Sequence, residues 1–407
     1  MASGHFVPYQ KLGVLVAVIT SLVFSIILSH DVVFEAPVAV VDLDGSRWSA
    51  DLIKKLDASA YISVREVTHS PADARELTKH DRVQAVFVIP KDAQAELARG
   101  SRSVMLGAML DDSNTAQNGE LLGQVNEIVA ELSAEVAVSR PGGVASLGKN
   151  ESETAAMLSP LRVAFRYLSN PTGQGSTGTV VSFLLFFSLM YHGLTSLMIV
   201  GRLRVTQQWE SKVLSGTLAA FLARGIPYAF IFTTVVMTAI AILSTFGQLR
   251  FAGNPVIFML ALFFGALANT WVAMLLSWGA TNPGAGASRM IFLVPPGFIL
   301  GGATMALGFV HGWVYLVSHG IPLVWIFKFW RDVGLRGMGW SDMWGLIGAF
   351  LCYLVFLAAL VGIRFWRDEV KAREALRESW EALGEIENRN KNNAPSAAPS
   401  PAPSTAA

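Results

Sequence analysis

One apolar run near the N-terminus is followed by about 150 water-compatible residues and then by five closely spaced apolar runs. The first run covers residues 7–28, which is long enough to cross the hydrocarbon core of a bilayer at ~1.5 Å per residue. The later runs cover residues 179–200, 226–246, 255–278, 290–309 and 344–363. This layout predicts an α-helical polytopic membrane protein with six spans, arranged one plus five, and a soluble insertion between spans 1 and 2.

Composition supports a membrane protein. Hydrophobic residues make up 52% of the chain and charged residues only 15%, and the mean hydropathy is +0.46. Ordinary soluble domains carry about 25% charged residues. The first run exceeds the ~7–15 residues of a signal-peptide core and no A-x-A-like cleavage site follows it. We therefore expect an uncleaved anchor.

Basic residues set the predicted orientation. Clusters of Arg and Lys lie between spans 2 and 3 and after span 6, and the positive-inside rule places both in the cytoplasm. The clusters consist of Arg202, Arg204, Lys212 and Arg224, and of Arg364, Arg367, Lys371, Arg373 and Arg377. With six spans, both termini are then cytoplasmic and residues 31–178 are extracytoplasmic.

The insertion at 31–178 predicts a small α/β domain. Apolar strands are expected at 37–43, 61–67, 84–89 and 103–110, and helices between them at 46–56, 71–78 and 92–98. Ser46 is placed to cap the first helix. A longer helix at 113–138 carries one apolar stripe, expected to pack on the sheet: Leu121, Val125, Ile128, Leu132 and Val136. The excess of acidic residues in the insertion argues against nucleic-acid binding.

One segment resembles a nucleotide-binding loop. Gly143, Gly148 and Lys149 have the spacing of a Walker A motif, but Asn150 stands where a Ser or Thr would hold Mg²⁺, and no strand precedes it. We expect no ATPase in this chain.

Other candidate catalytic groups have simpler explanations. Asp42 and Asp44 precede a glycine, a pattern typical of turns and helix caps. His69 and His80 are expected to be isolated on the surface, and the single cysteine, Cys352, lies in the last apolar run. We expect no catalytic residue, and no metal or cofactor bound by this chain.

The membrane half contains few ionisable groups. Between Glu153 and Asp332 the only acid is Glu210, which lies in a predicted cytoplasmic loop. His192 in span 2 is the one intramembrane candidate, either for contact with cargo or for a hydrogen bond within the bundle. Ion-coupled carriers usually place ionisable groups or unwound sites at the midplane, so we expect the energy for any transport to come from a partner.

Span 5 contains two helix-breaking pairs. Pro295 and Pro296 are followed by Gly301 and Gly302, so the helix is expected to kink or break near mid-membrane. Together with His192, these residues are candidates for the cargo route. The alternative is a packing kink filled by a neighbouring helix.

Residues 311–342 are aromatic-rich but too polar to span. They predict a pair of short re-entrant or interfacial helices, with four tryptophans at headgroup depth: Trp313, Trp325, Trp330 and Trp340.

The whole chain is predicted to have five parts. Residues 1–30 contain span 1, residues 31–178 form the external domain, and residues 179–366 form the five-span domain. Residues 367–387 form a charged cytoplasmic helix with little apolar face, and residues 388–407 form a disordered Pro/Ala/Ser-rich tail.

The order of these features over most of residues 8–370 resembles the permease subunit of the type-2 ABC exporters, the daunorubicin- and polysaccharide-exporter group. The strand VAVVDLDGS opens the external domain, and FRYLSNP at 165–171 is similar to the family's RxLYNP entry to span 2. In the external segment after span 5, Pro322, Leu323 and Arg331 fall on matching positions.

This resemblance implies a homodimer, or a heterodimer with a second permease, driven by a cytoplasmic ABC ATPase subunit that hydrolyses the ATP. The ATPase would grip the loop between spans 2 and 3, where Glu210, Gly216 and Thr217 match the family pattern and Arg202 and Arg204 flank it. The loop departs from that pattern in lacking its second acid–base pairs and in being shorter after Thr217.

The implied function is export of a hydrophobic or amphiphilic substrate out of the cytoplasm or inner leaflet of a bacterial plasma (inner) membrane, with a periplasmic adaptor as a further candidate partner. The alternative is a non-pumping envelope scaffold derived from such a permease. A membrane-bound enzyme is disfavoured because the sequence shows no nucleophile, metal cluster or acid–base pair.

Overall fold

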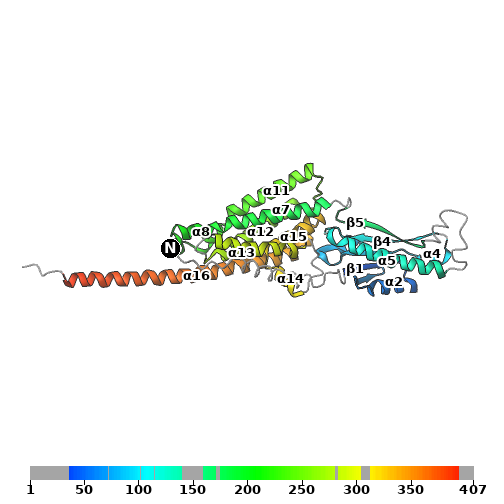
Figure 1. Ribbon diagram of the computed structural model, residues 1–407, viewed down its shortest axis with the longest axis horizontal. Helices are drawn as coiled ribbons and strands as arrows, with labels where there is room; N and C mark the ends of the chain where they lie inside the picture. Colours follow the sequence, from blue (N-terminus) through cyan, green and yellow to red (C-terminus); the bar gives the residue numbers. More distant parts are fainter. Residues whose placement is uncertain are drawn as a thin grey trace, which may run out of the picture.

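The computed structural model describes residues 36–71, 73–100, 102–113, 115–139, 159–170, 175–279, 283–303 and 312–393. A sheet domain lies at one end of an elongated molecule, apolar helices form the middle, and one long helix projects from the other end (Figure 1). The predicted span 1, the Walker-like loop and residues 394–407 lie outside the described residues. The prediction of a disordered tail from residue 388 is wrong for 388–393, which belong to the long C-terminal helix.

The sheet domain is built on five strands in the order β2-β1-β3-β4-β5. They are β1 (Ala36–Asp42), β2 (Ile62–Thr68), β3 (Ala85–Ile89), β4 (Val104–Leu110) and β5 (Leu161–Tyr167). β1 is parallel to β2 and β3, and β4 is antiparallel to β3 and parallel to β5. The four strands predicted from the sequence are confirmed, with ends that shift by one residue.

β5 was not predicted. Its sequence LRVAFRY alternates apolar and mainly polar residues, which is the pattern of a half-buried strand. Leu161 is buried, and Val163, Phe165 and Tyr167 pack against the same core, while Arg162 and Arg166 are exposed. The alternation was therefore present in the sequence, and the end of the strand overlaps the segment at 165–171 that resembles the family's entry to span 2.

Helices cover both faces of the sheet. α2 (Arg47–Asp57), α4 (Ala93–Arg99) and α5 (Thr115–Ser139) pack on one face, and the short α3 (Ala74–Leu77) packs on the other. Ser46 caps α2 as predicted: its hydroxyl accepts from the Ser49 amide at 3.1 Å, and the Ser49 hydroxyl accepts from the Ser46 amide at 3.0 Å. The predicted stripe of α5 faces the sheet core, with Leu121, Val125 and Leu132 buried.

The middle of the molecule consists of apolar helices. α7 (Gly175–Ser196) continues into α8 (Met198–Val205), followed by α9 (Trp209–Ser215), α10 (Leu218–Ala223), α11 (Ile226–Phe246), α12 (Pro255–Ser277) and α13 (Pro283–Phe298). α14 (Gly312–Ser318), α15 (Pro322–Phe329) and α16 (Trp340–Asn393) complete the chain. Within the described residues, four segments are long and apolar enough to cross a membrane: Thr179–Val205, Leu218–Phe246, Pro255–Ser277 and Trp340–Ile386. They lie on the predicted spans 2, 3, 4 and 6; the six-span count stays a prediction.

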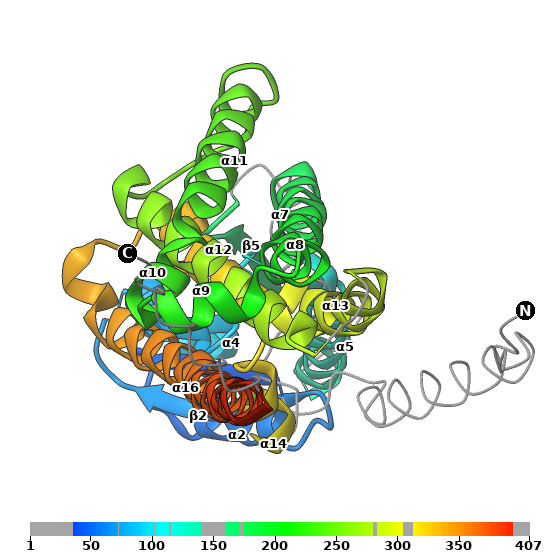
Figure 2. The same cartoon turned by 90° about the vertical axis from the view of Figure 1, so that its left-hand side faces the viewer.

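α12 is the central helix of the bundle. In its most apolar stretch 72% of the residues are buried, compared with 28% in the corresponding stretches of the segments that contain α11 and α16. Viewed along the bundle, α11 projects outward from its neighbours (Figure 2). Phe230, Ile231 and Val235 on α11 are about three-fifths exposed, as expected for side chains that face lipid or a second subunit.

The helix of predicted span 5 breaks at the glycine pair and not at the prolines. α13 runs through Pro295 and Pro296, and the π-type turn η3 (Ile299–Ala303) follows. Gly302 has a φ of +80°, a conformation open to glycine and strained for other residues. Pro295 and Pro296 lack the N–H group of a helical hydrogen bond, yet α13 continues past both to Phe298. The rest of the predicted span, from residue 304, is outside the described part.

The segment between predicted spans 5 and 6 contains two short helices, α14 and α15, as expected. Trp313 and Trp340 are exposed, whereas Trp325 and Trp330 are only 5% and 2% exposed, so the last two rings lie inside the protein. Seven of the eight residues of α15 are buried, Trp325 among them, and Trp330 follows directly after its end. That the four tryptophans lie at headgroup depth stays a prediction.

α16 joins the last predicted span and the predicted charged helix into one helix of 54 residues. Its C-terminal part projects beyond the bundle (Figure 1). The prediction of little apolar face is wrong, because large apolar side chains lie exposed there among the charges: Leu376, Trp380, Leu383 and Ile386.

The predicted orientation can be tested with single cysteines in a Cys352→Ala background. Ala98 on α4 and Ala382 on α16 are both exposed. In intact cells, a membrane-impermeant maleimide is expected to label Ala98→Cys and to spare Ala382→Cys until the membrane is opened. The reverse pattern would show that the sheet domain is cytoplasmic.

Candidate functional site

Two buried arginines after α15 connect the helix bundle to the sheet domain. The side chains of Arg331 and Arg336 are 5% and 6% exposed. Arg331 donates from Nη2 to Asp81 Oδ2 at 3.1 Å, and Arg336 also pairs with Asp81. Arg336 reaches Asp111 Oδ2 and Asp332 Oδ1, each at 2.5 Å. We call Arg331, Asp332, Arg336, Asp81 and Asp111 the junction cluster.

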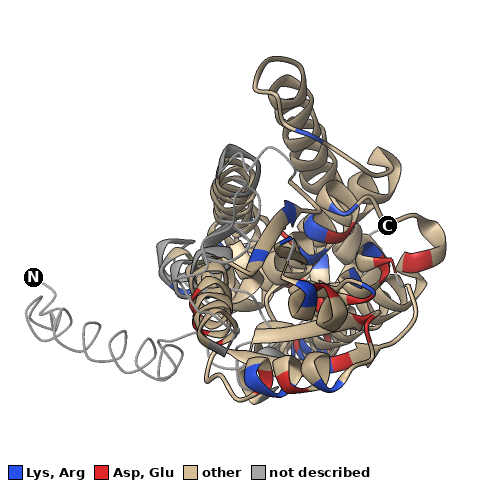
Figure 3. Ribbon diagram, turned by 90° about the vertical axis from the view of Figure 1, so that its right-hand side faces the viewer, with Lys and Arg blue, Asp and Glu red and all other residues tan. Residues whose placement is uncertain are grey.

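The junction cluster spans parts of the chain that are far apart in sequence. Asp81 ends the turn η1 (Lys79–Asp81), Asp111 follows β4, and the arginines lie in and after the π-type turn η5 (Trp330–Leu335). Seen from the sheet end, acidic and basic residues lie close together, whereas the projecting α11 is almost free of them (Figure 3). The cluster therefore sits where the charged and the apolar parts of the molecule meet.

The segment FRYLSNP at 165–171 joins the cluster from the end of β5. The Ser169 hydroxyl donates to Asp111 Oδ1 at 2.5 Å, and Asn170 Nδ2 donates to Asp112 Oδ2 at 3.0 Å. Two stretches that carry the family resemblance, this one and the segment with Arg331, thus converge on the acidic pair after β4.

Charge pairing decides the protonation states. Burial by itself would raise the pKa of Asp81, but the guanidiniums of Arg331 and Arg336 outweigh it and hold that pKa well below its usual range. Burial would lower the pKa of Arg336, but Asp111, Asp81 and Asp332 raise it above its usual value. Asp81 and Arg336 are therefore charged at neutral pH.

His80 is not isolated, contrary to expectation. Its Nδ1 atom lies 3.3 Å from Asp332 Oδ2, and the side chain is 36% exposed. The hydrogen bond to Asp332 raises the pKa of His80 against the opposing effect of burial. A histidine in the turn after α3 thus adds a titratable group to the junction cluster.

Arg331 also caps the broken helix. Its Nη1 atom donates to the Gly301 carbonyl at 2.6 Å, which satisfies a backbone acceptor freed by the break. A Cβ atom on Gly302 would lie 2.7 Å from Arg331 Nη1, and one on Gly301 would lie 2.4 Å from the Phe327 ring. The predicted external residue Arg331 and the glycines of the candidate cargo route are therefore in contact.

The contacts around Gly301 and Gly302 favour close packing of protein at the helix break over a passage for cargo there. Gly301 and Gly302 are buried, and α15 and η5 fill the space beside them. Pro295 and Pro296 are half-buried in the last turn of α13. Pro322 is buried at the first turn of α15, a position that suits proline. A role of the span 5 residues in the cargo route stays a prediction.

His192 links two helices. Its Nε2 atom lies 2.9 Å from the Ala266 carbonyl and 3.0 Å from Thr270 Oγ1, both on α12. One turn away, Asn269 Nδ2 donates to the Leu189 carbonyl at 3.1 Å. Of the two roles expected for His192, these contacts match a hydrogen bond within the helix bundle. Contact of His192 with cargo stays a prediction.

The loop between predicted spans 2 and 3 forms α9 and α10. Gly216 and Thr217 make the turn between them: a Cβ atom on Gly216 would lie 2.5 Å from the Lys212 carbonyl, and Thr217 Oγ1 accepts from the Ala220 amide at 3.2 Å. Arg202 and Glu210 are exposed. Gly216 and Thr217 thus shape the loop, while Arg202 and Glu210 are free to meet a partner.

Asp368 of α16 fixes the inner face of this loop. It accepts from Trp209 Nε1 at 3.0 Å and Trp278 Nε1 at 3.1 Å, and the two indoles meet edge to face at 5.1 Å. Arg204 lies 4.5 Å above the Trp209 ring, and its Nη2 atom is 3.5 Å from Asp368. The sequence suggested Arg204 as a docking residue, but it is half-buried in this contact.

The family model described as ABC-2 family transporter protein matches residues 12–363. The chain belongs to the ABC-2 transporter family. The resemblance inferred from the motifs is thereby confirmed. Membership in the ABC-2 family makes the chain a membrane transport component, in agreement with the four long apolar helices found in the described part of the chain.

Among solved structures, a domain described as part of an ABC type-2 transporter from Thermotoga maritima MSB8 is similar at 18% identity. The match covers 32% of this ABC-2 chain and 84% of that domain, with a TM-score of 0.24. No match was found among curated proteins.

Removing one arginine of the junction cluster should destabilise the protein. Arg336→Gln removes the guanidinium that pairs with Asp81, Asp111 and Asp332, and losing one partner of a buried network costs about 3–5 kcal/mol. We expect a clear drop in the melting temperature of the detergent-purified protein. Arg82→Gln, which breaks an exposed 3.4 Å pair with Glu66, is the control and should change little. Equal melting temperatures for the two variants would contradict a stabilising cluster.

His80 should make the junction sensitive to pH. Because its folded-state pKa is raised above the ordinary 6.5, its contribution to stability is complete below that value and is lost as pH rises through the higher folded pKa. The melting temperature of the wild type should therefore fall more between about pH 6 and pH 9 than that of His80→Gln. His69 was also expected to be isolated, but its Nδ1 atom lies 3.7 Å from Asp42 Oδ2, with the side chain 71% exposed. His69→Gln, which removes this weaker and more exposed contact outside the junction cluster, should keep the wild-type slope; parallel curves for all three proteins would rule out the effect.

Proposed function

We propose that this chain is the membrane subunit of an exporter that moves a hydrophobic or amphiphilic substrate outward and is powered by a separate cytoplasmic ABC ATPase. Membership in the ABC-2 family over residues 12–363 carries the proposal. The described apolar helices support an apolar cargo, because α11 and α12 contain no Asp, Glu, Lys or Arg. The ATP would be bound and hydrolysed by the partner.

The docking site for the ATPase is proposed on α9. Trp209 and Val213 bury the inner face of this helix, so its outer face is held in a fixed position. That outer face presents Glu210, Ser211 and Lys212 to the surroundings. A rigidly anchored helix with an exposed mixed-charge face suits a contact that must transmit a movement.

The remaining features of the proposal follow the predicted orientation. Both termini and α9 would face the cytoplasm of a bacterial inner membrane, and the sheet domain would lie outside. The exposed apolar side chains of α11 would face lipid or a second permease subunit, identical or different. An adaptor would reach the protein through the sheet domain.

The second candidate is a non-pumping envelope scaffold. The observation behind it is the loop between α8 and α11, which lacks the second acid–base pairs of the family pattern and is short after Thr217. A scaffold would keep the anchored fold of α9 without binding an ATPase.

Reversing the charge of Glu210 tests the docking site. Glu210→Lys should abolish co-purification of an ABC ATPase with the tagged protein, because it places a cation at the one acid of the loop. Glu385→Lys, at an exposed site on the projecting part of α16, is the matched control and should retain the ATPase. Retention by Glu210→Lys would refute docking at α9, and absence of any ATPase from the wild-type preparation would favour the scaffold.

A further inference from the structure

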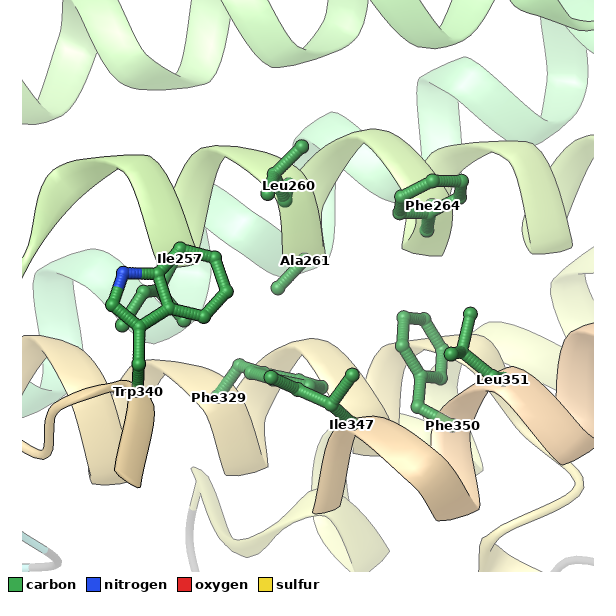
Figure 4. A pocket seen from close by; sticks show the side chains of 9 residues that line it. All are labelled: Ile257, Leu260, Ala261, Phe264, Phe329, Trp340, Ile347, Phe350 and Leu351. Carbon is green, nitrogen blue, oxygen red and sulfur yellow. The ribbon is translucent and has the colours of Figure 1, made fainter. Parts of the chain in front are cut away.

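One side of α16 packs on the bundle and another side is exposed. On the packed side, Ile347, Phe350 and Leu351 approach α12 across a groove of only about 80 Å³ (Figure 4). On the side turned away from α12, the apolar part of α16 is exposed, and small residues are frequent there: Gly345, Gly348, Ala349, Cys352 and Ala359. An exposed face on a membrane helix meets either lipid or another helix.

The two glycines of this face have no reason to be glycines within the described structure. A Cβ atom on Gly345 or Gly348 would meet no heavy atom within 4 Å beyond its own helix backbone, and neither residue has a positive φ. Glycine inside a helix costs roughly 1 kcal/mol relative to alanine. In membranes, small residues allow the backbone of a second helix to approach closely. The face therefore has the shape of a helix-packing surface whose partner lies outside the described residues.

The predicted span 1 contains a matching row of small residues. Gly13, Ala17, Ser21 and Ser25 are spaced four residues apart, and the other positions from 12 to 28 are apolar except for Thr20. In an α-helix, residues at this spacing lie one above the other on a single face. A row of small residues along a membrane helix predicts tight packing against another helix.

The start of β1 keeps the end of span 1 close to α16. Ala36 begins β1 at the edge of the sheet that faces the bundle, because Gln84 bonds the neighbouring Pro37 carbonyl and also the amide of Asp111 in the junction cluster, each at 2.8 Å. Lys79, five residues before Gln84, pairs with Asp342 in the first turn of α16 at 3.1 Å. Residues 29–35 reach at most about 25 Å, so span 1 ends within that distance of Ala36.

The other described segments that can span a membrane suit span 1 less well. α11 projects on the side of the bundle opposite to α16, β2 and α2 (Figure 2). α7 follows β5, which lies three strands from β1 in the sheet, about 14 Å away. α12 is largely covered by its neighbours. The position of β1 therefore favours α16 as the neighbour of span 1.

We propose that residues 7–28 pack antiparallel to α16, with their row of small residues against its exposed face. Spans 1 and 6 run in opposite directions through the membrane, with residues 28 and 344 at the same surface. At ~1.5 Å per residue, Ser21 then lies about 10.5 Å deep and Cys352 about 12 Å deep. The two rows of small residues come into register near the middle of the bilayer.

The large side chain of the exposed face also has a place in this packing. Phe356 is 58% exposed and lies about 18 Å from the surface, beside Ala17 at about 16.5 Å. A small residue opposite a large one lets the two helices interlock. A second copy of α16 on the same face would leave the small residues of span 1 unmatched.

The packing rests on the predicted crossing of the membrane by residues 7–28, and it does not involve ATP or α9. Its test is therefore independent of the test of export. With span 1 on α16, the exposed face of α11 is left for lipid or for a second permease subunit.

Disulfide formation with the native cysteine tests the contact. Membranes that contain the full chain with Ser21→Cys are oxidised with copper phenanthroline, and the linked peptides are identified by mass spectrometry. We expect an intramolecular disulfide with Cys352, because a disulfide requires Cα atoms only ~4.4–6.8 Å apart. Ile19→Cys and Val23→Cys are the controls: they lie within ~3 Å of the same depth but ~200° around the helix, and should not link.

A bulky side chain in the face should block the contact. Ala349→Leu should slow the disulfide between Ser21→Cys and Cys352 about tenfold, because it separates the helices. Ala241→Leu, at an exposed position of α11, is the matched control and should leave the rate unchanged. A second pair, Ser25→Cys with Gly348→Cys in a Cys352→Ala background, repeats the test if Ser21→Cys fails to fold.

Three outcomes would overturn the packing. The first is absence of a disulfide in both pairs, and the second is equal linking by the control cysteines at positions 19 and 23. The third is a wild-type dimer linked through Cys352, which would show that a second copy covers the face. Loss of ATPase docking with the disulfide retained would refute only the proposed export function.

Discussion

The guanidinium of Arg331 is the group on which both halves of the structure depend. One of its nitrogens satisfies the Gly301 carbonyl at the break after α13, and another pairs with Asp81 of the sheet domain. A broken helix in an apolar bundle needs a partner for its freed backbone groups, because no water replaces the lost hydrogen bonds. Here that partner is a side chain that is itself held by the sheet domain.

Burying charge in this way is stabilising only when every member is paired. Asp332 is fully buried; its Oδ1 atom pairs with Arg336 and its Oδ2 atom contacts His80. Asp111 is shared by Arg336 and Ser169. An alternative docking of the sheet domain would separate these charges from their partners at a cost of several kcal/mol each. The network therefore selects one relative arrangement of sheet and helices, whatever its net contribution to stability.

Local patterns in the sequence predicted much of the fold. Period-two and continuous apolar runs located β1 to β4, Ser46 marked the start of α2, and long apolar runs located α11 and α12 almost to the residue.

The junction cluster could not be predicted from the sequence, because Arg336 and Asp111 are 225 residues apart and each looks like a surface charge in its own context. Gly301 and Gly302 indicated a break, but nothing near them in sequence indicated that Arg331 would fill it. The burial of Trp325 and Trp330 was out of reach for the same reason: an aromatic residue in a short helix is compatible with an exposed face or with a core, and only tertiary packing decides.

The unbroken length of α16 gives the molecule a mechanical connection between its two ends. Asp342 in its first turn contacts Lys79 of the sheet domain, and Asp368 contacts Trp209 of α9. The two carboxylates are 26 residues apart on one helix, about 39 Å at ~1.5 Å per residue. The helix is continuous between them and contains no proline there, the residue that most often breaks or kinks a helix. One unbroken element therefore joins the contact with α9 to the contact with the sheet domain.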